Sequence, residues 1–256
     1  WGVDSGEEEE GPSTGAKYWL VQNTWGEDWG IKGVAKSAAT STAVKRVAEK
    51  LNINYFEVPT GWKNFCNLMD ANLITFCGEE SFGTSSSHIR EKDGIWAILF
   101  WLNIIAKTGK SVEQITRDFW AKYGRTYYLR FDFDGIDTKI ADKLMADLET
   151  RLKTLEKQTF EGYTVSKAEP FVYVDPVDKQ MTKNGLLVHF EGGARICYRL
   201  SGTGTNGATL RVYIESYDPS NFDKEATKVM VVSNRGMSEN ESKGIYEKLS
   251  VVVERF

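Results

Sequence analysis

From Gly33 onward, short apolar runs typical of strands alternate with spaced apolar stripes typical of helices. Ile53–Val58 and Leu73–Cys77 are short runs that predict strands. Before them, Thr40 or Ser41 can cap a helix. The apolar positions of that helix are Val44, Val47 and Leu51. Strands that alternate with helices in this way predict an α/β unit.

The longest apolar run, GIWAILFWLNIIA at Gly94–Ala106, is apolar around nearly the whole helical circumference. A membrane-spanning helix needs about 20 such residues, and residues 90–93, directly before this run, are all charged. A helix that is apolar on every side is typical of a protein core. We therefore predict a buried core helix and no membrane partner.

A second unit is predicted to begin after a hinge near Lys122–Arg125. Ser111 and Gln114 have the spacing of a capping box and start a helix that ends near Gly124. Tyr127–Phe133 alternates as a strand does. The long helix after it has the apolar stripe Ile140, Leu144, Leu148, Leu152 and Leu155. Further strands are expected at Phe171–Val174, Gly185–Phe190, Arg195–Leu200 and Thr209–Ser216, and a closing helix at Glu239–Val253.

Composition argues against some classes of partner. The 256 residues are 41% hydrophobic, enough for one large domain or two smaller ones. The formal net charge is -4, which argues against a nucleic-acid binder because no strong basic excess would attract a polyanion. The three cysteines are widely spaced and follow no metal or disulfide pattern, which favours a reducing, cytoplasmic compartment.

The strongest chemical signal is RLSGTGTNGATLR, at Arg199–Arg211, between two expected strands. Its glycines allow positive φ and close backbone approach, so that successive N–H groups can converge on an anion. Arg199 and Arg211 can each give bidentate bonds to phosphate. The added hydroxyl donors are Ser201, Thr203 and Thr205. An ordinary glycine-rich hairpin is the alternative, but Ser201–Ala208 exceeds the usual hairpin loop of about 2–5 residues. We favour phosphate binding.

A second polar segment, CGEESFGTSSSHIREKDG at Cys77–Gly94, directly follows an expected strand. Ligands of open α/β sheets bind beyond the carboxyl ends of the strands, and the carboxylates of this segment suit sugar hydroxyls. On the residues alone, a solvated polar loop is an equally good interpretation. His88 by itself is expected to be structural rather than catalytic.

The acidic segment FDFDGID resembles a carboxylate metal loop, but a simpler interpretation is available. Asp132 and Asp134 alternate with two phenylalanines, as on the polar face of a half-buried strand. Asp137 stands where it can cap the following helix. We therefore expect a strand and a helix cap here rather than a metal site.

Four motifs, in this order, resemble the eukaryotic-type phosphoglucomutases of the α-D-phosphohexomutase superfamily. They are VPTGWKNFCNLMDA (Val58–Ala71), CGEESFG (Cys77–Gly83), HIREKDG (His88–Gly94) and RLSGTGTNGATLR (Arg199–Arg211). The resemblance runs from about Gly33 almost to the end of the chain. It implies an incomplete α/β third domain with a mixed sheet and helices, hinged to an α+β fourth domain with an antiparallel sheet and two helices.

The resemblance also implies an activity and a set of site residues. The family interconverts glucose 1-phosphate and glucose 6-phosphate, using a phosphoserine, a glucose 1,6-bisphosphate intermediate and Mg²⁺. By position, Lys92 is implied as the proton-transfer residue. The implied sugar-binding residues are Thr60, Gly61, Glu79 and Ser81. The implied distal-phosphate residues are Arg199, Ser201, Gly202, Thr203, Gly204 and Arg211.

The chain also departs from the family pattern. Cys66, Ser85 and Ser87 stand where the family usually has Gly, Gly and Asp, which alters the expected sugar loop. The sequence contains neither a TASHNP-like phosphoserine loop nor a DGDGD-like metal loop. Enzymes accelerate phosphate-ester reactions by up to about 10²¹-fold, mostly through positioning and charge neutralisation. We therefore expect this chain alone to bind a phosphorylated hexose without turnover, with an N-terminal mutase half as partner.

The first 33 residues carry a different resemblance. KYWLVQNTWGEDWGIKG (Lys17–Gly33) is similar to the NSWG segment of papain-like cysteine proteases, in which Asn23 would orient a catalytic histidine. The acidic run before it, 7–10, predicts an exposed, flexible loop. The implied organisation is a chimera: a protease remnant at 1–33, the third mutase domain at 34–121 and the fourth at 122–256. Tyr18–Gln22 is expected to fill a vacant strand position in the third-domain sheet.

Three functions remain open on the sequence. The first is a phosphoglucomutase-family chain that keeps its sugar and distal-phosphate loops. The second is a non-catalytic phosphosugar-binding or scaffold module. The third, a cysteine protease remnant, is remote. Formation of glucose 6-phosphate distinguishes the first from the second.

Overall fold

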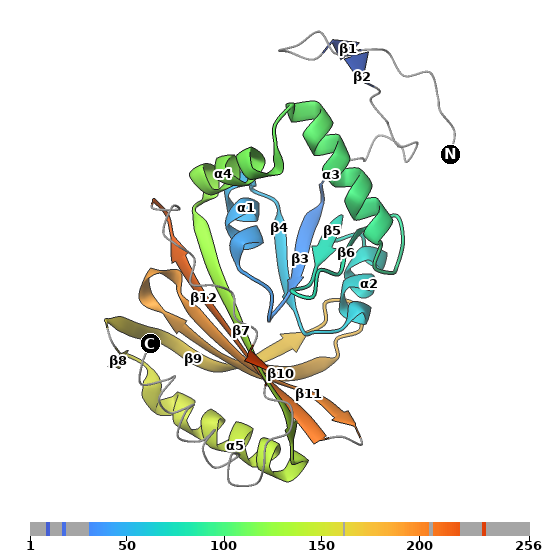
Figure 1. Ribbon diagram of the computed structural model, residues 1–256. Helices are drawn as coiled ribbons and strands as arrows, with labels where there is room; N and C mark the ends of the chain where they lie inside the picture. The colour runs from blue at the N-terminus through green and yellow to red at the C-terminus, as the bar shows by residue number, and fades with distance from the viewer. Residues whose placement is uncertain are drawn as a thin grey trace.

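The computed structural model describes residues 31–160, 162–204 and 207–220, together with short strands at 9–10, 17–18 and 232–233. Two larger sheets organise this part of the chain, one with four strands and one with seven (Figure 1). The closing helix predicted at 239–253 lies outside the described residues, as does most of the segment 1–30.

The first unit is a mixed sheet in the order β4-β3-β5-β6. Central β3 (Gly33–Ser37) pairs in parallel with β4 (Asn54–Val58) and β5 (Phe76–Gly78), whereas β6 (Thr84–Ser86) is antiparallel to β5. The parallel strands are connected by α1 (Ala43–Leu51) and α2 (Trp62–Asp70), as the α/β pattern predicted. Residues of the sheet, of α2 and of the segment between α2 and β5 form the core of this unit: Ala35, Val58, Phe65, Leu68, Met69, Ile74 and Cys77.

The apolar run forms α3 (Gly94–Thr108), but the prediction of a buried core helix is wrong. The rings of Trp96 and Phe100 lie 5.8 and 5.9 Å from that of Phe76, so one side of α3 packs on β5. In the described part no residue of α3 is fully buried, and Ile95 and Ile98 are 74% and 63% exposed. An apolar circumference predicts a partner on every side, and the described chain supplies one on the β5 side. Within the described ranges, no helix is long and apolar enough to cross a membrane.

The passage between the two sheets follows α4 (Val112–Tyr123), which has the predicted ends. Ser111 and Gln114 form the capping box, each side chain accepting the other residue's backbone N–H. Gly124 ends the helix with φ 78°, a value that favours glycine. The next strand begins at the following residue.

The second unit is a sheet in the order β13-β7-β12-β11-β10-β9-β8. Its long strands are antiparallel neighbours: β7 (Arg125–Ile136), β9 (Tyr163–Val174), β10 (Met181–Phe190), β11 (Arg195–Gly204) and β12 (Gly207–Asp218). The edge strands are β8 (Thr159–Phe160) and β13 (Val232–Ser233), and β13 is parallel to β7. The strands extend beyond the predicted bounds because pairing continues past their apolar segments.

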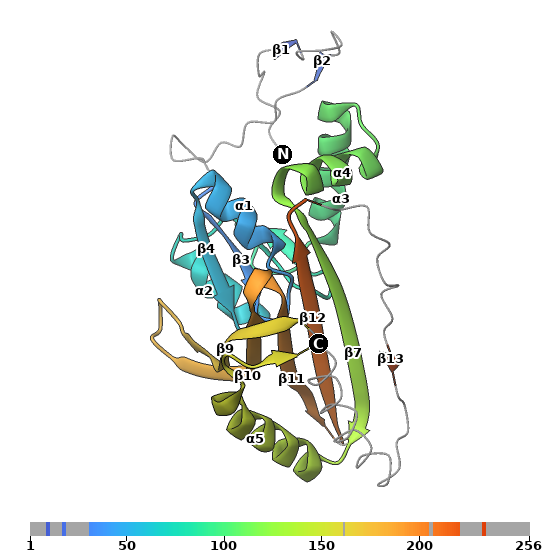
Figure 2. The ribbon, with the colours of Figure 1, turned by 90° about the vertical axis from the view of Figure 1, so that its left-hand side faces the viewer.

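One face of this sheet is covered by α5 (Thr138–Leu155). Asp137 caps α5 by accepting from two backbone N–H groups, as predicted. The predicted stripe makes the contact: Leu144 and Leu152 are buried, and Ile140, Leu148 and Leu155 pack beside them. Both views place α5 and the first unit on opposite sides of the sheet (Figure 1; Figure 2).

The other face meets the first unit through a buried ionic cluster. Arg195 of β11 lies 2.7 Å from Glu57 of β4 and 2.9 Å from Glu215 of β12. Its guanidinium also donates to the carbonyls of residues 38 and 40, at 2.9 and 3.0 Å. Lys36 of β3 pairs with Glu57 at 3.0 Å. Two cations and two carboxylates therefore join the units, and the side chains of Arg195 and Glu215 are only 4% and 3% exposed.

The N-terminal strands differ from expectation. β1 (Glu9–Glu10) pairs with β2 (Lys17–Tyr18) in a separate two-stranded sheet. Part of the acidic run, predicted to be a loop, is thus a strand, and Tyr18 is not in the four-stranded sheet. Residues 19–22, the rest of the segment expected to complete that sheet, lie outside the described residues.

Candidate functional site

The predicted phosphate loop is a hairpin between β11 and β12. Ser201 pairs with Thr209 and Gly204 with Gly207, with a register shift between these pairs. Only residues 205–206, outside the described residues, separate the strands, so the inference of a long loop is wrong: the strands continue into the motif. The expected positive φ does occur at one glycine of the motif, Gly202, where φ is 69°. A Cβ at this position would meet open space.

The two arginines of the motif lie directly opposite each other, Arg199 on β11 and Arg211 on β12. Arg211 is in turn opposite Asp132 of β7, which accepts two hydrogen bonds from Arg130. These side chains share the sheet face that meets the first unit, because residues of the alternate set on the same strands pack against α5. Sequence reasoning missed Arg130, although the alternation in YYLRFDF places it on the same face as Asp132.

Both motif arginines carry an N–H group without an acceptor. Nε of Arg199 and Nε of Arg211 are buried, and nothing in the described part of the chain accepts a hydrogen bond from either. A carboxylate oxygen of Asp132 lies 3.7 Å from Arg211 Nε, too far for a hydrogen bond. Burial alone would raise the pKa of Asp132, but Arg130, then Arg211 and Arg199, lower it, so this carboxylate is ionised. An anion could satisfy both orphaned donors.

The predicted sugar loop brings three candidate residues together. The carboxylate of Glu79, with its side chain only 5% exposed, pairs with Lys92 Nζ at 2.6 Å, and Ser81 donates to the same carboxylate at 3.5 Å. Gly83 permits this approach, because a Cβ there would lie 2.8 Å from the Lys92 side chain. The bond to Glu79 raises the pKa of Lys92, so its ammonium is charged and can act only as a donor.

The PTGW motif adds two buried donors beside this group. Gly61 is the N-cap residue of α2 and has φ 136°, which favours glycine. Thr60 Oγ1 and Trp62 Nε1 are buried, and among the described residues neither has a hydrogen-bond partner. Lys92 Nζ lies 5.4 Å from the centre of the Trp62 ring. Trp62 was not among the predicted site residues, although it belongs to the same motif.

Glu80, between the two predicted sugar residues, turns toward the second unit instead. It accepts hydrogen bonds from Tyr213 of β12 at 3.0 Å and from Ser37 of β3 at 3.2 Å. Tyr213 in turn accepts from Arg199 at 3.2 Å. The sheet face that carries Arg199 and Arg211, called the arginine face below, is therefore connected to the sugar loop through Tyr213 and Glu80. No local sequence signal identified these two residues.

The other candidates have structural roles. His88 lies between Ser86 and Asp93, at 2.6 and 2.9 Å, which agrees with its predicted structural role. Asp132 is bonded to arginine and Asp134 accepts from Thr209 at 2.8 Å. Within residues 31–160, 162–204 and 207–220, no three His, Cys, Asp or Glu side chains cluster as metal ligands. These residues therefore do not fit the Mg²⁺ that the family resemblance implies.

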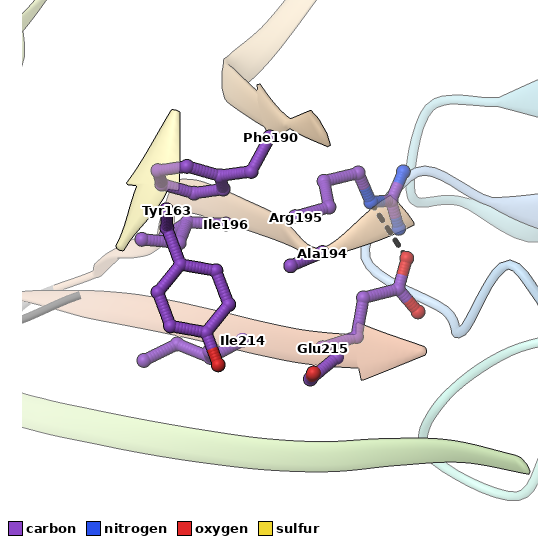
Figure 3. Close-up of a pocket in the computed structure, with 8 residues that line it drawn as sticks. Tyr163, Phe190, Ala194, Arg195, Ile196, Ile214 and Glu215 are labelled. Atoms are coloured by element: carbon purple, nitrogen blue, oxygen red, sulfur yellow. Dashed lines mark ion pairs between the residues drawn. The ribbon is translucent and has the colours of Figure 1, made fainter. Parts of the chain in front are cut away.

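A small pocket lies at the end of β10–β12, away from both candidate loops (Figure 3). Its walls are mostly apolar: Tyr163, Phe190, Ala194, Ile196 and Ile214. Its two charged residues, Arg195 and Glu215, already pair with each other. We assign no ligand to this pocket.

Comparison with known proteins matches both units to one family. A family model described as "Phosphoglucomutase/phosphomannomutase, alpha/beta/alpha domain III" matches residues 14–123. A second, "Phosphoglucomutase-1, C-terminal domain", matches residues 125–242. The first range begins before Gly33 and so includes the segment that resembles papain-like proteases, a resemblance that stays a prediction.

Individual relatives give the same result. Phosphoglucomutase from Rhizobium radiobacter is 54% identical over 191 residues, and phosphoglucomutase-1 from Homo sapiens 50% over 196, each alignment covering 74% of this chain. The chain spans only 35% of the length of these relatives. The crystal structure of pp63/parafusin, a phosphoglucomutase from Paramecium, in its open form, matches with a TM-score of 0.73 and 43% identity. That match covers 88% of this chain and 38% of parafusin.

The two family models meet where the chain passes from the mixed sheet to the larger sheet, and each range corresponds to one unit of the fold. The relatives and the parafusin structure agree with both assignments. The chain therefore belongs to the phosphoglucomutase family, of which it carries domain III and the C-terminal domain.

Proposed function

We propose that this chain binds a phosphorylated hexose between its two units, as the C-terminal part of an enzyme that interconverts glucose 1-phosphate and glucose 6-phosphate. The observation that carries the proposal is the pair of buried, unpartnered Nε–H groups on Arg199 and Arg211, on a face where the described residues leave them without an acceptor. Phosphate oxygens accept such charge-assisted bonds well. In the proposed complex, Ser201, Gly202, Thr203 and Gly204 complete the cradle for the distal phosphate.

The sugar is proposed to lie against the loop of the first unit. Glu79 would accept hydrogen bonds from sugar hydroxyls, and Ser81 would donate to one. Thr60 and Gly61 would line the same side of the site. The unpartnered hydroxyl of Thr60 supports this, since a buried donor gains most from a ligand. Lys92, charged and held by Glu79, is proposed to hold the proton that passes to the reacting oxygen.

We propose that turnover needs groups beyond these 256 residues. The phosphoserine, the Mg²⁺ ligands and the handling of glucose 1,6-bisphosphate are assigned to an N-terminal mutase half, because the described residues do not fit Mg²⁺. The proposed division is residues 34–121 and 122–256, with 1–33 as the protease-like remnant. The three free cysteines support a reducing, cytoplasmic location.

Titration of the purified chain with glucose 1-phosphate tests the binding site. Loss of one charge-assisted bond costs about 1.5–3 kcal/mol, so Arg211→Ala should weaken binding roughly 10- to 100-fold. Arg151→Ala removes the same charge from an exposed position on α5 and should leave affinity unchanged. Equal affinity of Arg211→Ala and the wild type would refute the phosphate role.

A coupled assay for glucose 6-phosphate tests the assignment of turnover. With Mg²⁺ and glucose 1,6-bisphosphate, the chain alone should form no product above the uncatalysed background. Addition of a separately produced N-terminal mutase half should restore product formation, and Lys92→Ala should then lower it. Product formation by the chain alone would overturn the proposed dependence on a partner.

A further inference from the structure

A hydrogen-bonded chain of side chains crosses between the two units. Arg199 Nη2 donates to the hydroxyl of Tyr213 at 3.2 Å, and that hydroxyl donates to Glu80 Oε1 at 3.0 Å. Ser37 donates to the other oxygen of Glu80 at 3.2 Å. The sequence of contacts runs from the arginine face, through β12, to the loop that carries the proposed sugar residues.

The direction of this chain is fixed by chemistry. A guanidinium can only donate, and an ionised carboxylate can only accept, so the Tyr213 hydroxyl must accept from Arg199 and give its one proton to Glu80. Tyr213 is 2% exposed, and burial raises the pKa of its hydroxyl despite the nearby Arg199, so the proton stays in place. The hydrogen bond to Glu80 therefore increases the negative charge on the Tyr213 oxygen that accepts from Arg199.

The consequence for Arg199 is a fixed orientation. One corner of its guanidinium is held by Tyr213, and its Nε–H is left without an acceptor in the described part of the chain. Arg211, directly across the sheet, would repel a freely moving guanidinium. A planar fork that is held in advance loses less conformational freedom when it binds a planar pair of phosphate oxygens.

We propose that Glu80 and Tyr213 are positioning residues: they hold Arg199 in the geometry that receives the distal phosphate. Through them the sugar loop is coupled to the arginine face. This inference rests on the proposed binding of a phosphorylated hexose. It assigns Glu80 a role different from that of its neighbours Glu79 and Ser81, which are proposed to contact the sugar. The ion pairs of the Arg195 cluster do not include Glu80 or Tyr213 and also connect the two units.

The test is titration of the full chain with glucose 1-phosphate and, separately, with inorganic phosphate. Tyr213→Phe removes a single oxygen and should weaken binding of both probes by about 2- to 10-fold, the value of one hydrogen bond. Glu80→Ala should give a similar loss. The double variant should bind no more weakly than Tyr213→Phe alone, because the two residues act through one chain.

Two further variants separate positioning from general stability. Tyr128→Phe removes a hydroxyl from the same interface, where it donates to the carbonyl of Ala39 at 2.8 Å, and should leave phosphate affinity unchanged. Glu80→Gln keeps an acceptor for Tyr213 and should recover most of the affinity lost in Glu80→Ala. If Tyr213→Phe fails to fold, the Glu80 pair gives the same test.

The outcomes distinguish the two proposals. If the wild type binds neither probe, the proposed function and this inference both fall. If the wild type binds and Arg211→Ala does not, but Tyr213→Phe and Glu80→Ala bind as the wild type does, the inference alone is wrong. Equal losses in Tyr128→Phe and Tyr213→Phe would also overturn it, because the effect would then be one of interface stability.

Discussion

Replacement of Arg195 by methionine should undo the largest polar contact between the two units. The guanidinium, with its side chain 4% exposed, lies 2.7 Å from Glu57 and 2.9 Å from Glu215. Methionine fills a similar volume but leaves Glu215 buried without this cation. Breaking a buried ion pair by removing one partner costs about 3–5 kcal/mol. We expect the free energy of unfolding to fall by that amount, measured by urea unfolding at pH 7 with tryptophan fluorescence.

The control removes a cation from an exposed pair of similar length. Lys183 lies 2.6 Å from Glu149, with the two side chains 51% and 36% exposed. Solvent screens such a pair, so Lys183→Met should cost less than about 1 kcal/mol. Adding Glu215→Gln to Arg195→Met should recover part of the loss, because the orphaned charge is removed. A cost below about 1 kcal/mol for Arg195→Met would refute the reasoning.

The pH dependence of Arg195→Met follows from Glu57. Burial alone would raise the pKa of Glu57, but Lys36 and Arg195 together lower it. A depressed carboxyl pKa stabilises the fold above the unfolded pKa of about 4.3, and that contribution is lost as the pH falls through the folded value. The variant lacks part of this contribution. The difference in stability between the two proteins should therefore stay constant from pH 7 to about pH 5 and shrink as the pH falls below about 4.3.

Three further predictions concern other parts of the chain. Burial, and after it Arg195, lowers the pKa of Lys36 to about 8 in the folded state. Between pH 8 and 10.5 the lysine is therefore protonated only in the unfolded state, so the unfolding free energy of the wild type should rise by on the order of 3 kcal/mol relative to that of Lys36→Met. If urea unfolding gives the two proteins the same change of stability with pH, this prediction is wrong. Ile95→Lys with Ile98→Lys should lower binding of an apolar dye to α3 while changing stability by less than about 0.5 kcal/mol; unchanged dye fluorescence would contradict it. Gly185→Ala should cost about 2 kcal/mol or more in thermal unfolding, because φ is 93° and a Cβ would lie 2.5 Å from the Tyr198 carbonyl oxygen; a loss under about 0.5 kcal/mol would contradict that.

Local signals predicted those elements whose partners lie close in sequence. The capping box at Ser111 and Gln114, the cap at Asp137 and the apolar stripe of α5 each depend on residues within one or a few turns. The prediction for α3 failed for the opposite reason. Its apolar composition indicates that it packs against other parts of the protein, but only tertiary structure decides which of its sides are covered.

The candidate site divides in the same way. The motif containing Arg199 and Arg211 was visible in one stretch of chain, and alternation in β7 could have added Arg130. The roles of Tyr213 and Glu80 could not be predicted, because their contact joins residues 133 positions apart across two sheets. The assumed long phosphate loop was wrong because glycine content does not tell whether strand pairing continues through a motif.

The two faces of the large sheet differ in a way that stability alone does not explain. On the α5 side, the alternate residues of the same strands are apolar and close-packed, as a fold under selection for stability alone would have them. On the other side, Arg199 and Arg211 stand opposite each other, although like charges in that arrangement are destabilising. Asp132 offsets part of the repulsion, yet each arginine keeps a buried N–H for which no acceptor occurs in the described ranges. A face that is costly when empty, and on which two paired strands each leave a buried donor without an acceptor, is what we expect of a surface whose complement is an anion.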